Sequence, residues 1–175
     1  MGIVWMLTAA CGLLAGRFHH TVGIAPVLGV ILCAACFLKP RQLFWIGWGG
    51  MLLRDGLVGF SPFTLVRLLA ITAVVAAVVR LRLRPTFRSL AVGLLLVSPV
   101  YHGLLTVGDW WTGTCVVLPR TAEGLARAFA TALPYLGRAF VGDLLFTSVF
   151  LALCTMAAYA AAGRRPLALV PRKVR

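Results

Sequence analysis

Long apolar runs dominate the pattern of hydrophobic and polar positions along the chain. Six of them are long enough to cross, or nearly cross, the roughly 30 Å hydrocarbon core of a bilayer as helices. They lie at residues 3–16, 22–38, 42–59, 62–80, 88–107 and 139–162. Charge and proline mark the breaks between them, as at Lys39-Pro40-Arg41 and Arg84-Pro85. The pattern predicts an all-α, polytopic membrane protein with six transmembrane helices.

The segment at 108–138 has a different pattern from the six runs. It opens with Asp109-Trp110-Trp111 and contains Pro119 and Pro134. Its second half places apolar residues at helical spacing, at Leu125, Phe129, Ala132, Leu133 and Leu136. We expect a long connection here that carries a short amphipathic helix before the last span, lying at the interface or folded over the bundle.

Composition excludes a soluble domain. Of 175 residues, 61% are hydrophobic and 12% are charged, whereas a soluble globular domain carries about 25% charged residues. The net charge of +13 would indicate a nucleic-acid partner in a soluble protein. In a membrane protein the same excess sets orientation, so no nucleic-acid partner is predicted. We expect residues 1–163 to form a single transmembrane domain that contacts lipid, and residues 164–175 to form a basic cytoplasmic tail.

The distribution of basic residues predicts the topology. With both termini inside, the inner segments hold eleven of the 17 basic residues and none of the four acids. The inner residues are Lys39, Arg41, Arg80, Arg82, Arg84, Arg88, Arg164, Arg165, Arg172, Lys173 and Arg175. Because basic residues are retained on the cytoplasmic side, we expect a multi-pass protein of the bacterial cytoplasmic membrane with cytoplasmic N- and C-termini.

Four charged residues fall within about one turn of the predicted outer helix ends: Arg54, Asp55, Arg67 and Asp143. A charge at membrane depth costs on the order of 3 kcal/mol and is usually paired or facing a polar cavity. Two interpretations remain open. The charges form structural ion pairs that fix helix packing, or they converge on a ligand pocket.

The Asp109-Trp110-Trp111 triplet also has two interpretations. Interfacial tryptophans commonly anchor a helix in the membrane. A tryptophan pair beside an acid, on an outward-facing loop, is also a means of stacking a flat heteroaromatic ligand. We therefore take Asp109, Trp110 and Trp111, together with the four charged residues above, as the candidate ligand-binding residues.

Other motifs indicate neither catalysis nor a cofactor. The chain contains no phosphate-binding loop, nucleophile elbow or zinc-protease motif, so no enzyme activity is predicted. Cysteine and histidine spacing predicts no metal site, and Cys33 and Cys36, set in an apolar run, are interpreted as buried structural thiols. The small-residue patterns Gly12–Gly16 and Ala25–Gly29 are weak indications of a helical partner.

Several segments together resemble a family of uncharacterised bacterial membrane proteins that is similar to the substrate-binding S components of energy-coupling factor (ECF) transporters. The matching segments are residues 23–29, 54–59, 98–111, 133–134 and 142–147. The chain departs from the family pattern at Arg54, where a Ser or Thr usually precedes the acid. The resemblance implies a six-helix S-component-like fold, capture of a vitamin- or cofactor-like molecule, and a transmembrane coupling subunit with ATPases as partners.

Two functions from different classes follow from these observations. The first is a substrate-binding subunit of a transporter, which takes up a small molecule through an outward-facing pocket. The alternative is a non-transporting structural or assembly subunit of a cell-envelope complex. Outer charges that converge on a reachable cavity favour the first function, and a tightly packed outer half with each Asp bonded to an Arg favours the second.

Overall fold

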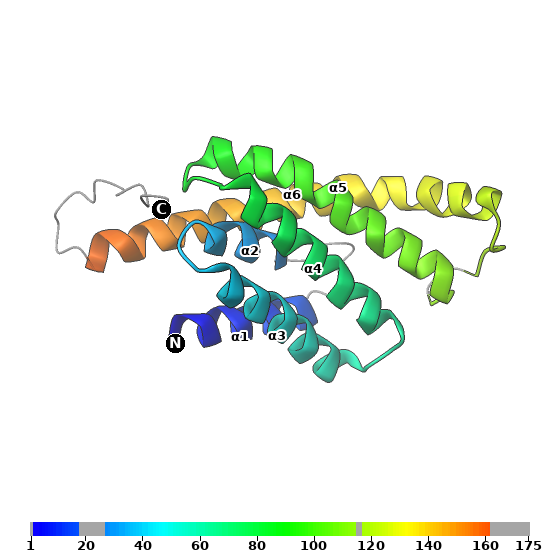
Figure 1. The fold of residues 1–175 in the computed structure, drawn as a ribbon, viewed down its shortest axis with the longest axis horizontal. Coiled ribbons are helices and arrows are strands. Elements are labelled where there is room, and N and C mark those ends of the chain that lie inside the picture. The colour runs from blue at the N-terminus through cyan, green and yellow to red at the C-terminus, as the bar shows by residue number, and fades with distance from the viewer. Residues whose placement is uncertain (1, 18–26, 115–116, 162–175) are drawn as a thin grey trace.

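The computed structural model describes residues 2–17, 27–114 and 117–161, and their regular elements are all helices. These are α1 (Gly2–Arg17), α2 (Val27–Ala35), α3 (Pro40–Val58), α4 (Phe63–Leu81), α5 (Phe87–Thr112) and α6 (Ala122–Ala161). The α2–α3 and α4–α5 connections lie at one end of the bundle, and the α3–α4 and α5–α6 connections lie at the other (Figure 1). The all-α prediction is confirmed, and the predicted tail at 164–175 lies outside the described residues.

Three of the described helices, α4, α5 and α6, are long and apolar enough to cross a membrane. Helix α3 has as many residues as α4, but it carries Arg41, Arg54 and Asp55. Helices α1 and α2 are shorter, with 16 and 9 residues. Each predicted apolar run therefore contains a helix, while the count of six spans stays a prediction.

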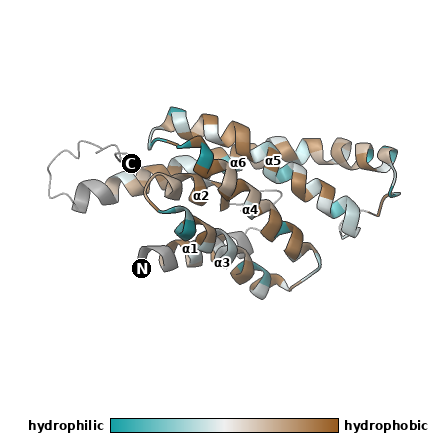
Figure 2. Cartoon of the chain, in the orientation of Figure 1, coloured by the Kyte–Doolittle hydropathy of each residue, from teal (hydrophilic) through white to brown (hydrophobic). Residues whose placement is uncertain are grey.

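The surface of these helices is apolar. Hydrophobic residues predominate along the helices, and strongly hydrophilic positions lie at connections such as those between α4 and α5 and between α5 and α6 (Figure 2). Large side chains such as Leu65 and Leu69 on α4 and Leu145 and Leu153 on α6 are exposed. Contiguous exposed apolar surface is rare in soluble monomers and suits contact with lipid. The chain is thus a protein rich in membrane helices.

Helix α2 forms the centre of the bundle. Its residues from Val27 to Ala34 are all buried, and it contacts each of the other described helices. Gly29 makes this packing possible, because a Cβ there would lie 2.8 Å from the backbone nitrogen of Thr147 on α6. Similarly, a Cβ at Gly12 would lie 2.7 Å from Leu53 on α3. These two glycines, one from each predicted small-residue pattern, allow close helix contacts within the chain.

Two predictions about the segment at 108–138 are wrong. Helix α5 continues to Thr112, so Asp109, Trp110 and Trp111 lie on its last turn. The helix ends at Gly113, which has a φ of +65° and donates its N–H to the Asp109 carbonyl at 2.7 Å.

The expected short amphipathic helix is not separate from the last span. Residues 122–138 form the first part of α6, a continuous helix of 40 residues that contains Pro134. A proline removes one backbone hydrogen bond, and membrane helices tolerate this loss. The connection between α5 and α6 is therefore confined to residues 113–121.

Candidate functional site

The turn between α3 and α4 brings charged residues together at one end of the bundle. Helix α3 ends at Gly59, whose φ of +119° suits glycine and whose N–H donates to the Asp55 carbonyl at 2.7 Å. The Ser61 N–H donates to the Thr64 hydroxyl at 3.2 Å and fixes the entry into α4. The last turn of α3 thereby faces the second turn of α4, which carries Arg67.

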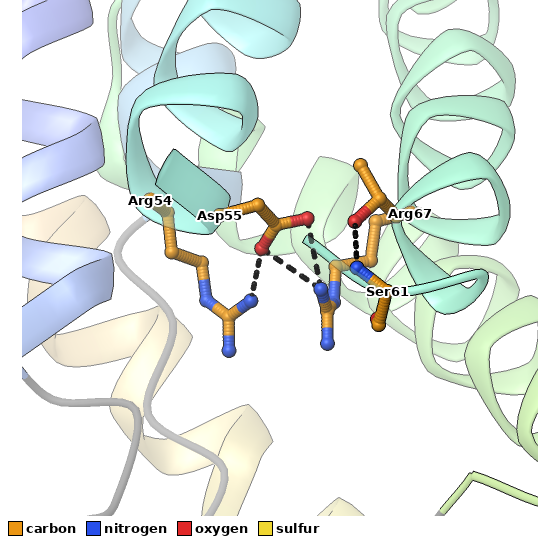
Figure 3. Close-up of polar contacts among 5 residues, drawn as sticks. Arg54, Asp55, Ser61 and Arg67 are labelled. Atoms are coloured by element: carbon orange, nitrogen blue, oxygen red, sulfur yellow. Dashed lines mark hydrogen bonds and ion pairs between the residues drawn. The ribbon is translucent and has the colours of Figure 1, made fainter. Parts of the chain in front are cut away.

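Asp55 lies at the centre of the α3–α4 cluster, which we define as Arg54, Asp55 and Arg67. Its side chain is fully buried, with 0% exposure. Arg67 Nη1 donates to Asp55 Oδ1 at 2.8 Å and to Oδ2 at 2.9 Å. Arg54 Nη1 also donates to Oδ1 (Figure 3). The cluster joins two guanidinium groups to one carboxylate and therefore has a net positive charge.

Asp143 lies in a different polar group, the α5–α6 cluster, which we define as Ser98, His102 and Asp143. The Asp143 side chain is also fully buried, with 0% exposure. The Ser98 hydroxyl donates to Asp143 Oδ2 at 3.1 Å, and His102 Nε2 lies 3.3 Å from the same oxygen. Among the described residues, Asp143 Oδ1 has no hydrogen-bond partner. This carboxyl group is held by polar side chains rather than by arginines.

A cavity of about 400 Å³ lies between α5 and the first half of α6. Its walls are mostly apolar, with Phe63 contributed by α4. Polar groups on the walls come from His102, Thr106, Asp109 and Tyr135. This combination of an apolar wall with a few polar groups is typical of sites for small molecules.

Each cluster is connected to this α5–α6 cavity through one aromatic residue. His102 belongs to the α5–α6 cluster and also lines the cavity. Phe63 lines the cavity as well, and the Arg67 guanidinium lies over its ring at 4.7 Å from the centroid. Arg67 is thus linked to the cavity wall by a cation–π contact.

The structure distributes five of the seven predicted site residues over three places. It brings Arg54, Asp55 and Arg67 together and sets Asp143 apart from them, in the α5–α6 cluster. Asp109 lines the cavity. Of the four charged residues at the predicted outer helix ends, three therefore lie together and Asp143 lies apart from them.

The tryptophan pair points elsewhere. Trp110 Nε1 donates to the Pro119 carbonyl at 3.0 Å and holds the α5–α6 connection. Trp111 is 61% exposed and lies beneath the Arg120 guanidinium, 5.5 Å away. Neither indole is among the residues that line the cavity. Their positions fit the interfacial anchor better than the stacking platform.

Sequence reasoning missed Ser98 and His102. Their signal is a spacing. His102 lies four residues after Ser98, and Asp109 lies seven residues after His102, so all three share one face of α5. The Cys33 thiol, by contrast, is buried and donates to the Thr147 carbonyl at 3.3 Å, as its structural interpretation requires. Within the described ranges, no three His, Cys, Asp or Glu side chains are grouped to hold a metal ion.

Fold and site together define a protein of apolar membrane helices with two polar clusters and a partly open cavity. The chain belongs to DUF6580, a family of unknown function, whose model matches residues 1–166. The expectation of an uncharacterised family is confirmed, while the likeness to ECF S components stays a prediction. No curated protein matches the chain, and no solved structure matches it either.

Proposed function

We propose that this membrane protein binds a vitamin- or cofactor-like small molecule in the α5–α6 cavity, as the substrate-binding subunit of a transporter. The observation that carries the proposal is the cavity of about 400 Å³, whose mostly apolar wall carries a few polar groups, among them His102 and Asp109. Its volume falls in the range of roughly 300–1,000 Å³ that is typical of small-molecule sites. Polar groups at fixed positions would orient a ligand whose body is buried against the apolar wall.

His102 is the polar group that is best positioned for this role. Its Nε2 lies 3.3 Å from the buried Asp143 carboxylate, which also accepts from Ser98. A neutral imidazole that donates its Nε2–H to Asp143 has its Nδ1 free to accept from a ligand. Asp143 acts in this arrangement through His102, by fixing the orientation of the ring.

Uptake is the second part of the proposal. Asp109 and the α5–α6 connection lie at the end of the bundle opposite the other two connections. Of these, the α2–α3 connection carries Lys39 and leads into Arg41 on the first turn of α3, and the α4–α5 connection carries Arg84. By the positive-inside rule, the cavity end faces outward. A ligand would enter from outside, and a partner coupling subunit with ATPases would supply the energy for its movement.

The test compares two glycines that differ in their position relative to the cavity. An added Cβ meets nothing within 4 Å at Gly103, which lines the cavity, or at Gly137, which does not. Mass spectrometry of protein purified in mild detergent measures the small molecule that each form retains. We expect wild type and Gly137→Phe to retain it and Gly103→Phe to lose it, because the phenyl group fills the cavity. Wild-type protein without any small molecule, or Gly103→Phe with as much as wild type, would refute the proposal.

A structural or assembly role remains the alternative, and one observation favours it. Asp55 is bonded to two arginines and joins α3 to α4, as expected of an ion pair that fixes helix packing. In that role Gly103→Phe would leave assembly of the envelope complex intact. The same variant therefore separates the two functions when ligand retention and complex assembly are measured side by side.

A further inference from the structure

The α3–α4 cluster carries more positive charge than its own acid neutralises. Within the described part of the chain, Arg54 and Arg67 form ion pairs with Asp55 and with no other acid. Arg127 at the same end of the bundle is different, because it pairs one-to-one with Glu123 at the exposed start of α6. An uncompensated charge near membrane depth costs on the order of 3 kcal/mol. A bound anion would remove that cost.

The two arginines also have hydrogen-bond donors to spare. Each uses only its Nη1 group on Asp55, which leaves the Nη2 and Nε groups without a partner among the described residues. In Figure 3, the outer nitrogens of both guanidinium groups point to the same side, away from Asp55. The side chains are 16% and 17% exposed, whereas Asp55 is sealed beneath them.

This geometry is suited to an oxyanion. A guanidinium group presents its N–H donors in a rigid fork that matches carboxylate and phosphate oxygens. Asp55 holds two such forks side by side, and its single negative charge offsets only one of their two positive charges. The buried acid thus acts as a positioning residue for two cationic groups.

Phe63 connects this pair of arginines to the cavity. Phe63 lines the α5–α6 cavity, and the Arg67 guanidinium lies over its ring, 4.7 Å from the ring centroid. A ligand with an apolar body and an acidic end group therefore fits both neighbours, because its body can lie against Phe63 while the acid lies next to Arg67. The arrangement predicts an amphipathic anion rather than a neutral or cationic molecule.

We propose that Arg54 and Arg67 form an oxyanion-binding site, which takes the carboxylate or phosphate group of a molecule whose apolar part lies in the α5–α6 cavity. The apolar part of this inference rests on the proposed function, whereas the charge excess of the cluster does not. An anionic lipid and a soluble acid offer the same oxyanion chemistry. The experiment therefore has one arm for each source.

The first arm uses 4-phenylbutyrate and its uncharged primary amide as probes. Calorimetry measures their binding to the full-length protein in nanodiscs made only of phosphatidylcholine. We expect the carboxylate to bind wild type about tenfold more tightly than the amide, because a charge-assisted hydrogen bond replaces a neutral one. The preference should fall below about twofold in Arg67→Gln and persist in Arg127→Gln, the matched control.

Arg67→Gln leaves Asp55 paired with Arg54, so we expect this variant to fold. Arg67→Lys provides a second variant that keeps the charge and the ion pair but lacks the planar fork. It should show a preference between those of wild type and Arg67→Gln. A preference in Arg67→Gln equal to that of wild type would contradict the inference.

The second arm measures lipid retention by native mass spectrometry. If the oxyanion is a lipid phosphate, wild type retains phosphatidylglycerol over phosphatidylcholine and Arg67→Gln does not. Retention of phosphatidylglycerol without binding of either soluble probe would support the oxyanion site and count against the proposed soluble ligand. Equal binding of carboxylate and amide, with no Arg67-dependent lipid retention, would overturn the oxyanion site and leave the cavity proposal standing.

Discussion

The α3–α4 cluster and the α5–α6 cluster both accommodate a buried aspartate, but with different partners. Each contains an aspartate on an apolar helix with 0% exposure of its side chain. Asp55 is neutralised by Arg54 and Arg67, which together donate hydrogen bonds to both of its carboxylate oxygens. Asp143 contacts a serine hydroxyl and a histidine, and its Oδ1 has no partner in the described part of the chain.

The difference separates two kinds of buried acid. Removing one member of a buried ion pair leaves a full charge unpaired and lowers the free energy of unfolding by about 3–5 kcal/mol. Removing one neutral hydrogen bond costs about 0.5–1.5 kcal/mol. We therefore expect the α3–α4 cluster to depend strongly on its charges and the α5–α6 cluster to tolerate a neutral replacement of its acid.

The largest expected effect is that of Asp55→Asn. The substitution keeps the shape of the side chain but leaves Arg54 and Arg67 close together without a counter-charge. We expect the free energy of unfolding to fall by about 3 kcal/mol, at the low end of the range because both arginines are partly exposed. Reversible unfolding in detergent micelles, followed by circular dichroism, measures the change.

The control for this prediction is Glu123→Gln. Glu123 pairs with Arg127 on the surface, where the two side chains are 73% and 65% exposed. An exposed pair of this kind contributes about 0–1 kcal/mol, so the variant should unfold almost like wild type. Equal losses in Asp55→Asn and Glu123→Gln would show that burial does not set the cost at Asp55.

The sequence predicts the α3–α4 cluster because its residues lie near the ends of consecutive helices. Arg54, Asp55 and Arg67 flank one short connection, so antiparallel helices bring them together whatever the fine details of packing. One of the two interpretations of the sequence grouped Asp143 with them, because it lies at a similar predicted depth. Depth in the membrane does not fix the rotation of a helix about its axis, however, and α6 turns Asp143 toward Ser98 and His102 of α5.

The helix boundaries near the cavity were harder to predict for a related reason. Trp110 and Trp111 suggested a loop because such residues are common at membrane interfaces, yet the first strong stop signal after them is Gly113. The short helix expected before the last span is the first part of α6, which continues through Pro134. The cavity itself depends on the pairing of α5 with the first half of α6, which no local pattern specifies.

A smaller effect is expected from Gly29→Ala, which tests how rigidly α6 is held beside the α5–α6 cluster. The new Cβ would lie 2.8 Å from the Thr147 nitrogen and 3.1 Å from the Phe146 carbonyl carbon, and these backbone atoms cannot rotate away. We expect a loss of about 2 kcal/mol in the free energy of unfolding, within the range for overpacking. Thermal unfolding in detergent provides the measurement.

Gly137→Ala is the matched control on α6, because an added Cβ there meets nothing within 4 Å. Alanine also favours helix by up to about 1 kcal/mol relative to glycine, so this variant should be neutral or slightly stabilised. If both alanines have the same effect, the contact between Gly29 and Thr147 is not tight in solution.

The smallest effect is expected from Asp143→Asn, which makes the same chemical change as Asp55→Asn in the other cluster. The asparagine oxygen can still accept from the Ser98 hydroxyl, and no arginine loses a counter-charge. The free energy of unfolding should change by less than about 1 kcal/mol. His102, however, would exchange a carboxyl group for an amide beside its Nε2. Under the proposed function, retention of the small molecule should therefore fall more than stability does, and mass spectrometry of the purified variant would reveal this loss.

A stability loss as large as that of Asp55→Asn would mean that Asp143 also bears a charge on which the fold depends, and the contrast between the two clusters would be refuted.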